Sequence, residues 1–169
     1  MNNTKVLDAK ELEAFFAKLG PKAPAAIGHY IQEVGAGEAI ALARLSDDNP
    51  SAVLAVAYVL LHNQYAHSHE SGLCVLDDIW VADKDTTPIV FALMMPDILD
   101  ITHGSVDAAI PVGQTDFLVA ALTQGFTKYV GDPEQDKGIL LYTYTGKHPW
   151  EVHERPVKFK EATRAGELL

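Results

Sequence analysis

The sequence Gly72-Leu-Cys-Val-Leu-Asp-Asp-Ile-Trp-Val81 opens the segment, residues 72–126, that decides the fold of this chain. Its β-branched and aromatic residues lie between a glycine and the polar run Ala82-Asp-Lys-Asp85, a pattern that predicts a strand. Residues 106–112 form a second short apolar run of the same kind. A helical run follows each strand, and the segment closes on Gln124-Gly-Phe126. The segment therefore predicts a strand-helix-strand-helix unit.

Local signals mark where the two helices begin and end. Thr86-Thr87-Pro88 offers an N-cap hydroxyl followed by a proline, which suits a first helical turn that needs no N–H. Pro96 falls inside the apolar run that follows, and an interior proline costs about 3 kcal/mol unless the helix breaks. We therefore expect a kink, or two short helices, between Thr87 and His103. Thr115-Asp116 predicts the cap of the second helix, which Gly125 ends.

From about Leu7 to Tyr144, this order of elements resembles the GCN5-related N-acetyltransferase superfamily, in which a similar Gly-Phe pair precedes the last long strand. Here that pair is Gly125-Phe126. The resemblance implies an α+β fold in three layers, with a mixed, mostly antiparallel sheet of about six strands and helices on both faces. It also implies acetyl-CoA as the acyl donor and an amine, on a small molecule or a protein, as the acceptor.

The loop after the first strand departs from the family's pattern, Val-x-Pro-x-x-Arg/Gln-x-x-Gly-x-Gly/Ala. Counting from Val81, Asp83 replaces the proline, Thr86 the Arg/Gln, and Ile89 and Phe91 the glycines. Bulky side chains obstruct the approach of a phosphate to the backbone, and acidic ones repel it. The residues that the resemblance assigns to the cofactor are Ile79, Trp80, Val81, Lys84, Thr86, Thr87 and Gln114.

Asp77 and Asp78 are the candidate catalytic residues, because the family often places on this strand a carboxylate that takes a proton from the amine. Successive side chains of a strand face opposite ways, so we expect only one of the two to face the cleft. The alternative is that one pairs at a sheet edge and the other caps a loop. The family's frequent tyrosine, which protonates the leaving thiolate, falls on Ala121, so that general acid is missing.

The rest of the chain fits the same architecture. Asp8 is a plausible N-cap for a helix that ends at Gly20, and Ser46-Asp-Asp-Asn-Pro50 is a turn cluster. The other predicted elements are a strand at 5–7, a helix at 24–34 and strands at 39–45, 52–61 and 139–145. We thus expect an acetyltransferase-like domain at residues 1–146 and a C-terminal tail at 147–169.

Composition limits the function classes. A chain of 169 residues with 48% hydrophobic content can bury one core, and a formal charge of -10 argues against a nucleic-acid partner. The single cysteine, Cys74, excludes a disulfide framework and is more typical of a core thiol than of a nucleophile. The sequence has neither an apolar run of about 18 residues nor the features of a signal peptide. We expect a cytoplasmic protein with no membrane partner.

One histidine cluster could suggest a metal site. His67 and His69 would face one side of an extended chain, near His62 and Glu70. No cysteine lies nearby and the histidines lack helical spacing, so a polar strand end and turn explain the segment better. We predict no metal, while His62 could lie at the substrate cleft.

Two functions remain open. The first is an acetyl-CoA-dependent N-acetyltransferase with a divergent cofactor loop. The second is a non-catalytic acetyltransferase-like domain used for protein binding or assembly, for example as a virion component. A different α+β sandwich is a third possibility for the fold. The tail bears on this choice, because Trp150, Val152, Val157 and Phe159 need a surface to cover. We expect the tail to act as an assembly arm, for example in a homo-oligomer, rather than to close its own domain.

Overall fold

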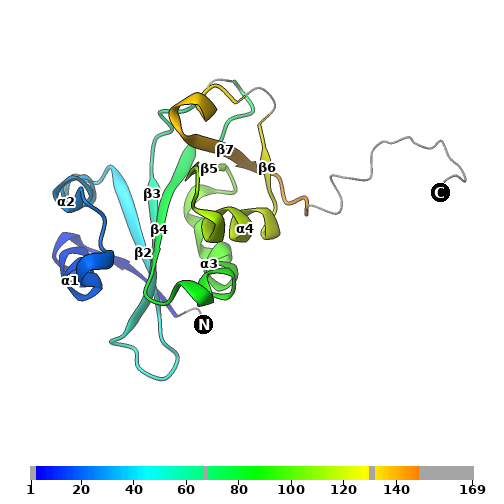
Figure 1. Cartoon of the computed structure of the whole chain (residues 1–169). Coiled ribbons are helices and arrows are strands. Elements are labelled where there is room, and N and C mark those ends of the chain that lie inside the picture. The colour runs from blue at the N-terminus through cyan, green and yellow to red at the C-terminus, as the bar shows by residue number, and fades with distance from the viewer. Residues whose placement is uncertain (1–2, 67, 130–131, 149–169) are drawn as a thin grey trace, which may run out of the picture.

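The computed structural model describes residues 3–66, 68–129 and 132–148, which fold around one mixed sheet (Figure 1). Its seven strands lie in the order β1-β2-β3-β4-β5-β7-β6. Every neighbouring pair is antiparallel except β4 and β5, which are parallel. The strands are β1 (Thr4–Leu7), β2 (Ala39–Leu45), β3 (Val53–Leu60), β4 (Cys74–Val81), β5 (Val106–Pro111), β6 (Phe126–Lys128) and β7 (Ile139–Tyr144). The predicted α+β class is confirmed, and β6 is a strand that the sequence did not predict.

Four α-helices cover the two faces of the sheet within the described residues. They are α1 (Ala9–Leu19), α2 (Ile27–Gly35), α3 (Thr87–Thr102) and α4 (Thr115–Thr123), with short 3-10 turns η1 (Gly20–Lys22), η2 (Lys84–Thr86) and η3 (Gln135–Lys137). Helices α1 and α2 lie on one side of the sheet, and α3 and α4 lie on the other (Figure 1). The chain therefore has the three layers that the sequence predicted.

The start of α1 is the clearest case of sequence chemistry fixing an element. The Asp8 carboxylate accepts a hydrogen bond from the Glu11 N–H at 2.8 Å, and the Glu11 carboxylate accepts one from the Asp8 N–H at 3.0 Å. This reciprocal capping box satisfies two donors that the first turn leaves unpaired. The helix ends at Gly20, whose φ of 57° favours glycine. Both predicted ends of α1 are confirmed.

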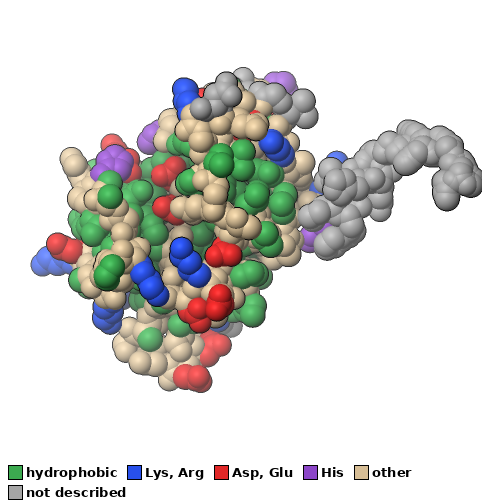
Figure 2. Space-filling view, in the orientation of Figure 1, with side chains coloured by type: hydrophobic (Ala, Val, Ile, Leu, Met, Phe, Trp, Pro, Cys, Tyr) green, Lys and Arg blue, Asp and Glu red, His purple; other side chains and the backbone are tan. Residues whose placement is uncertain are grey.

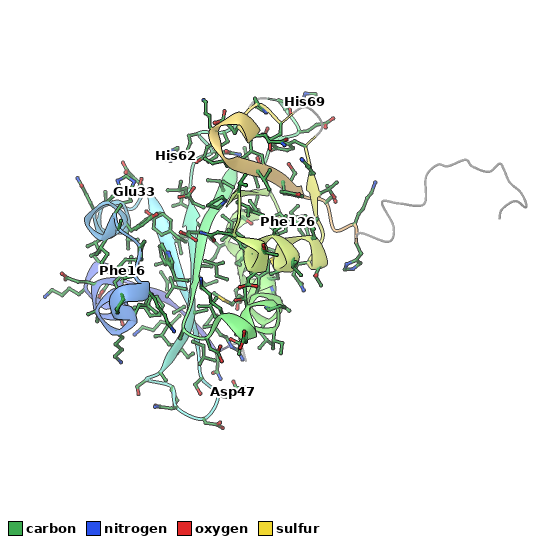
Figure 3. All side chains as sticks on the ribbon, in the orientation of Figure 1. Phe16, Glu33, Asp47, His62, His69 and Phe126 are labelled. Carbon is green, nitrogen blue, oxygen red and sulfur yellow. The ribbon has the colours of Figure 1, made fainter. Side chains whose placement is uncertain are left out.

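The two cores lie on opposite faces of the sheet. Phe91 of α3 and Phe117 of α4 pack with Phe126 on one face. Phe16 of α1 packs edge-on against Trp80 of β4 on the other, with ring centroids 4.8 Å apart. Figure 3 shows Phe16 and Phe126 on these opposite sides. Because each face is covered by its own helix pair, the central strands are buried on both sides.

Helix α3 corrects one of the two alternatives expected around Pro96. It runs without a break from Thr87 to Thr102, so the prediction of two short helices is wrong. Pro96 is exposed while Met94, Met95 and Ile98 around it are buried, so packing against the sheet offsets the hydrogen bond that proline removes.

The predicted side-chain caps of α3 and α4 are also wrong. Thr86 is at the N-cap of α3, but its hydroxyl donates to the Asp83 carbonyl at 2.6 Å and makes no cap bond. The N-cap of α4 is Gln114, again without a side-chain cap bond, so Thr115 and Asp116 lie in the first turn. The capping hydroxyl of Thr86 is used by the preceding 3-10 turn, which the sequence pattern did not reveal.

Candidate active site

Strands β4 and β5 separate partway along their length. They pair at Cys74–Val106, Val75–Asp107 and Leu76–Ala108, and no pair of these two strands follows in the described structure. Beyond this point Ile79 to Val81 pair with β3, and Ala109 to Pro111 pair with β7. The two strands therefore lie side by side at one end and open at the other. They thus form a splayed parallel pair near the centre of the sheet.

A buried carboxylate ties the closed end of the pair together. Asp107 of β5 is fully buried and accepts hydrogen bonds from the Gly72 N–H at 2.8 Å and the Asn63 side chain at 2.7 Å. Thr143 of β7 donates to it at 2.9 Å, and the Tyr129 hydroxyl donates to it as well. A side chain on Gly72 would meet the backbone of β5 at 2.7 Å, so only glycine fits there. The strands are held together here, so the opening lies at the other end.

A β-bulge in β4 places the two candidate carboxylates. Tyr58 of β3 pairs with Asp78, whereas the next residue, Val59, pairs with Leu76, so Asp77 is the extra residue. The bulge reverses the alternation of the strand. Leu76 and Ile79 pack in the core under α3 and α4, while the core under α1 and α2 contains Val75 and Trp80.

Asp77 and Asp78 consequently share one face. Asp77 keeps the orientation of Val75 and Asp78 that of Trp80, so both carboxylates lie on the α1 and α2 side. Their negative charges both raise the pKa of Tyr30 in α2. Regular alternation, which led us to expect one carboxylate facing the cleft, does not hold across the bulge, and it is Asp78 rather than Asp77 that lines the cavity described below.

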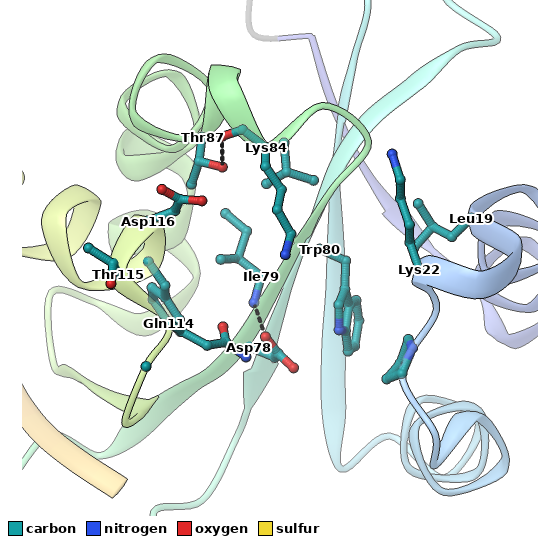
Figure 4. A pocket seen from close by; sticks show the side chains of 14 residues that line it. Leu19, Lys22, Asp78, Ile79, Trp80, Lys84, Thr87, Gln114, Thr115 and Asp116 are labelled. Carbon is teal, nitrogen blue, oxygen red and sulfur yellow. Dashed lines mark hydrogen bonds between the residues drawn. The ribbon is translucent and has the colours of Figure 1, made fainter.

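The opening between the strands is a cavity of about 360 Å³ (Figure 4). Its walls come from β4, the η1 and η2 turns, and the first turns of α3 and α4. The lining residues are Leu19, Lys22, Pro24, Asp78, Ile79, Trp80, Val81, Lys84, Thr87, Gly113, Gln114, Thr115, Asp116 and Phe117. Six of the seven predicted cofactor residues therefore meet in one cavity, whereas Thr86 is not among its lining residues. Asp78 lines it, and Asp77 lies beside Asp78 outside the lining.

The bulky residues of the departing loop leave this cavity open. Ile89 is 66% exposed, and Phe91 is buried in the core with Phe117 and Phe126. Neither lines the cavity. The first backbone N–H groups at the helix start are nevertheless not free to bind a ligand. The Thr86 N–H donates to the Asp83 carbonyl, and the Thr87 N–H donates to the Lys84 carbonyl. The cleft is open, but its backbone donors are fewer than a free helix start would offer.

Asp78 has the electrostatic character of a base. Burial raises the pKa of its carboxyl to about 6, and the charge of Asp77 adds to the rise. The Ile79 N–H, which donates to Asp78 at 2.8 Å, and the Trp80 indole oppose it. Burial also raises the pKa of Asp77, as does the nearby Glu33 carboxylate, whereas His29 lowers it. A base whose pKa lies near the working pH transfers protons most effectively.

An aromatic wall adjoins the two carboxylates. Tyr30 of α2 packs edge-on against Tyr58 and Trp80, with ring centroids 4.8 and 4.9 Å apart. The Tyr58 hydroxyl donates to Glu33, which lies on α2 (Figure 3). Burial raises the pKa of Tyr30 to about 12, so its hydroxyl stays neutral. The sequence did not single out these residues, because α2, β3 and β4 come together only in the fold.

No group of three metal-binding side chains gathers among the residues that the structure describes. His62 and His69 are exposed near one end of the sheet (Figure 3), and His62 does not line the cavity. His67 lies outside the described residues. Burial raises the pKa of the Cys74 thiol, which disfavours the reactive thiolate.

Comparison with solved structures identifies the fold. The chain is similar to a probable acetyltransferase from Staphylococcus epidermidis ATCC 12228, with 15% identity, a TM-score of 0.56, and coverage of 86% of this chain and 100% of that one. It is also similar to AAC(6')-Ib in complex with ribostamycin and coenzyme A, with 14% identity, a TM-score of 0.54, and coverage of 92% and 97%. The fold is that of the GCN5-related N-acetyltransferases, so the alternative of an unrelated α+β sandwich is wrong.

No protein-family model matches the chain, and no curated protein matches it in sequence. At these low identities the structural likeness establishes the fold alone. Within the described residues, no helix is both long enough and apolar enough to cross a membrane.

Proposed function

We propose that this chain is an N-acetyltransferase that transfers an acetyl group from acetyl-CoA to an amine. The observation that carries the proposal is the open cavity between β4 and β5, which has Asp78, a carboxyl of raised pKa, in its wall. A carboxylate that is partly withdrawn from water beside a cleft is a good candidate for a general base.

The cavity wall offers groups that suit the acyl donor chemically. The edge of β4 beyond Leu76 has no β5 partner in the described structure, so backbone groups are available to the amides of a pantetheine arm. The predicted cofactor residues Ile79, Trp80 and Val81 form this wall, with Lys84 and Thr87 at one end and Gln114 opposite. When bound, acetyl-CoA supplies the acetyl group on its thioester.

Asp78 would then activate the acceptor. It takes a proton from the acceptor's ammonium group, so that the nitrogen lone pair can attack the thioester carbonyl. The new N–C bond forms as the C–S bond breaks, the nitrogen gives its second proton to water, and the sulfur leaves as a thiolate. Ala121 stands where the family pattern has its acid, and no tyrosine is among the described lining residues, so we assign protonation of the thiolate to water.

The acceptor would approach from the α1 and α2 side. Besides burial, the Glu33 carboxylate raises the pKa of Asp77, and the Asp77 carboxylate raises the pKa of Asp78. Glu33 also forms an ion pair with His29 at 3.3 Å. In the space-filling view, acidic and basic side chains both lie in the hollow between the two helix pairs (Figure 2). Negative charge beside aromatic rings favours a cationic amine, whether it belongs to a small molecule or to a protein.

A direct test is to incubate the full chain with acetyl-CoA and a panel of small amines and lysine-containing peptides. Release of the coenzyme A thiol, together with the mass of an acetylated amine, supports the proposal. A matched panel of alcohols is the control, because an ammonium proton is what Asp78 is proposed to take. If no amine is acetylated at any pH between 6 and 9, the enzymatic proposal fails.

A second candidate is a binding or assembly domain, which one surface feature favours. Ile89 and Leu93 lie one turn apart on α3 and are 66% and 47% exposed, an apolar pair suited to a partner. We propose a domain at 1–146 and a tail at 147–169 that acts as the arm of a homo-oligomer. Cytoplasm is the proposed compartment for the enzyme, and a virion for an assembly protein.

Truncation separates these roles of the tail, whose residues from Pro149 lie outside the described residues. If the tail is an assembly arm, a chain lacking Trp150 to Leu169 keeps its melting temperature and loses its oligomeric state in light scattering. A monomer before and after truncation, with a large drop in melting temperature, contradicts the arm.

A further inference from the structure

Two lysines reach the candidate cofactor cavity from opposite walls. Lys84 belongs to η2, directly after β4, and Lys22 belongs to η1, directly after α1. Both line the cavity, and Figure 4 shows the Lys84 side chain running into it and Lys22 standing on the facing wall. The Lys22 ammonium donates to the Ala82 carbonyl at 3.4 Å, close to the end of β4. Elements about 60 residues apart in sequence therefore bring two positive charges to one opening.

Neither ammonium is neutralised by a carboxylate in the described part of the chain. The ion pairs recorded there involve Lys5, His29, Arg44 and Lys137, and not the two cavity lysines. Other described lysines, such as Lys10 and Lys18, also have no recorded ion pair, so Lys22 and Lys84 differ from them in lining one cavity together. The carboxylates of Asp78 and Asp116 line the same cavity, so an anion is expected to bind at the part of the wall where the two lysine ammonium groups lie.

The backbone at the start of α3 is poorly suited to hold that anion alone. The N–H groups of Thr86 and Thr87 donate to main-chain carbonyls, and both threonine hydroxyls do the same, at 2.6 and 2.7 Å. Pro88 has no N–H to offer, and the Asp83 carboxylate accepts from the Asp85 N–H in the same turn. A phosphate therefore meets few free donors and nearby negative charge at this helix start.

We infer that Lys22 and Lys84 together bind the phosphate groups of the acyl donor, in place of the backbone N–H groups that this loop has lost. The inference rests on the proposed function, and it adds a residue, Lys22, from a different part of the chain. A lysine ammonium binds phosphate as a point charge and needs no fixed geometry, so two of them can grip a pyrophosphate from either side. Binding that depends on these charges is also weakened by added salt.

The test compares two probes on the full chain by calorimetric titration. Coenzyme A carries the phosphates, and pantetheine has the same thiol arm without them. Lys22→Gln and Lys84→Gln are each expected to weaken coenzyme A binding by about fivefold to tenfold, and the double variant by more. Pantetheine binding stays unchanged in all three variants. Lys84→Arg, which keeps the charge, stays close to the unmodified chain.

Lys10→Gln is the matched control, because it removes the same charge from an exposed site on α1 that does not line the cavity. Circular dichroism melting checks that the exposed lysine changes leave the fold intact. The inference is overturned if the double variant binds coenzyme A as tightly as the unmodified chain, or if pantetheine binding falls equally; the proposed function survives either result. If the unmodified chain binds neither probe, the proposed function and the inference both fall.

Discussion

The two faces of the sheet use strand β4 in different ways. Under α3 and α4, its side chains Leu76 and Ile79 enter a core that continues into Phe91 and Phe126. Under α1 and α2, its side chains Val75 and Trp80 enclose the carboxylates Asp77 and Asp78 between them. The difference arises from one extra residue in the strand. The bulge thus places both acid groups on one face of an otherwise regular strand.

This contrast separates stability from chemistry. The α3 and α4 face buries apolar side chains, whose contribution to folding stability follows from the area that they bury and from their packing. The other face buries carboxylates with raised pKa values, which costs stability and favours proton transfer. Substitutions on the first face are therefore expected to change folding, and substitutions at the bulge to change activity.

The largest expected effect is on activity. Asp78→Asn keeps the shape of the side chain and removes its proton-accepting charge. It should lower kcat for acetyl transfer by roughly 100-fold or more, the range expected for a general base. Steady-state kinetics with acetyl-CoA and the best amine measure this loss. Asp100→Asn, an exposed carboxylate on α3, is the control, and equal rates for both variants would remove Asp78 from the mechanism.

The next effect is on folding. Phe91→Ala empties space in the core between α3, α4 and β6 and should lower the free energy of unfolding by about 3–5 kcal/mol. Urea unfolding followed by circular dichroism measures the change. The exposed neighbour Ile89→Ala should change it by less than about 0.5 kcal/mol. If the folded fraction of Phe91→Ala loses activity as completely as Asp78→Asn does, the proposed separation of a stability face from an activity face is wrong.

The closed end of the strand pair gives a third test. Asp107→Asn leaves a side chain of the same size but removes the charge that accepts from Gly72, Asn63 and Thr143. We expect a loss of about 1–3 kcal/mol, because a buried donor is left with a weaker acceptor or none. The same unfolding titration measures it. A neutral result would show that packing alone keeps β4 and β5 together at this end.

The smallest effect concerns pH. Burial raises the pKa of Asp78 to about 6 in the folded state, above the ordinary unfolded value, so the folded state binds more protons in the window between them. Stability from this group is present at low pH and is lost as pH rises toward and through 6. Asp78→Asn should therefore be more stable than the unmodified chain at pH 7, by up to about 2 kcal/mol, and not at pH 3. Melting temperatures across that range would detect the crossover, whereas a constant difference would contradict it.

Patterns within a few residues of sequence predicted much of the fold, whereas the features that depend on contacts between distant residues were not predicted. The Asp8 and Glu11 pattern, the Gly20 stop and the apolar run of β4 act within a few residues, so the sequence shows them directly. The bulge at Asp77 depends on how β3 and β4 align, which no local pattern records.

The site shows the same division. The predicted cofactor residues were assigned from the family resemblance, and all of them except Thr86 line one cavity. The sequence did not single out Lys22, Tyr30 and Glu33, because they reach the site from η1 and α2, which are distant from β4 in sequence. The three-residue strand β6 is too short to have a periodicity, and it forms because β7 pairs with it. Pro96 predicted a break that packing prevented.

We propose that the opening between β4 and β5 holds an acetyl donor, and calorimetric titration of the full chain with acetyl-CoA would show whether it does. We predict saturable binding at one site per chain, retained in Asp78→Asn, because that side chain acts on the acceptor's proton rather than on the coenzyme. No binding of acetyl-CoA to the correctly folded chain, even at millimolar concentration, would contradict the account.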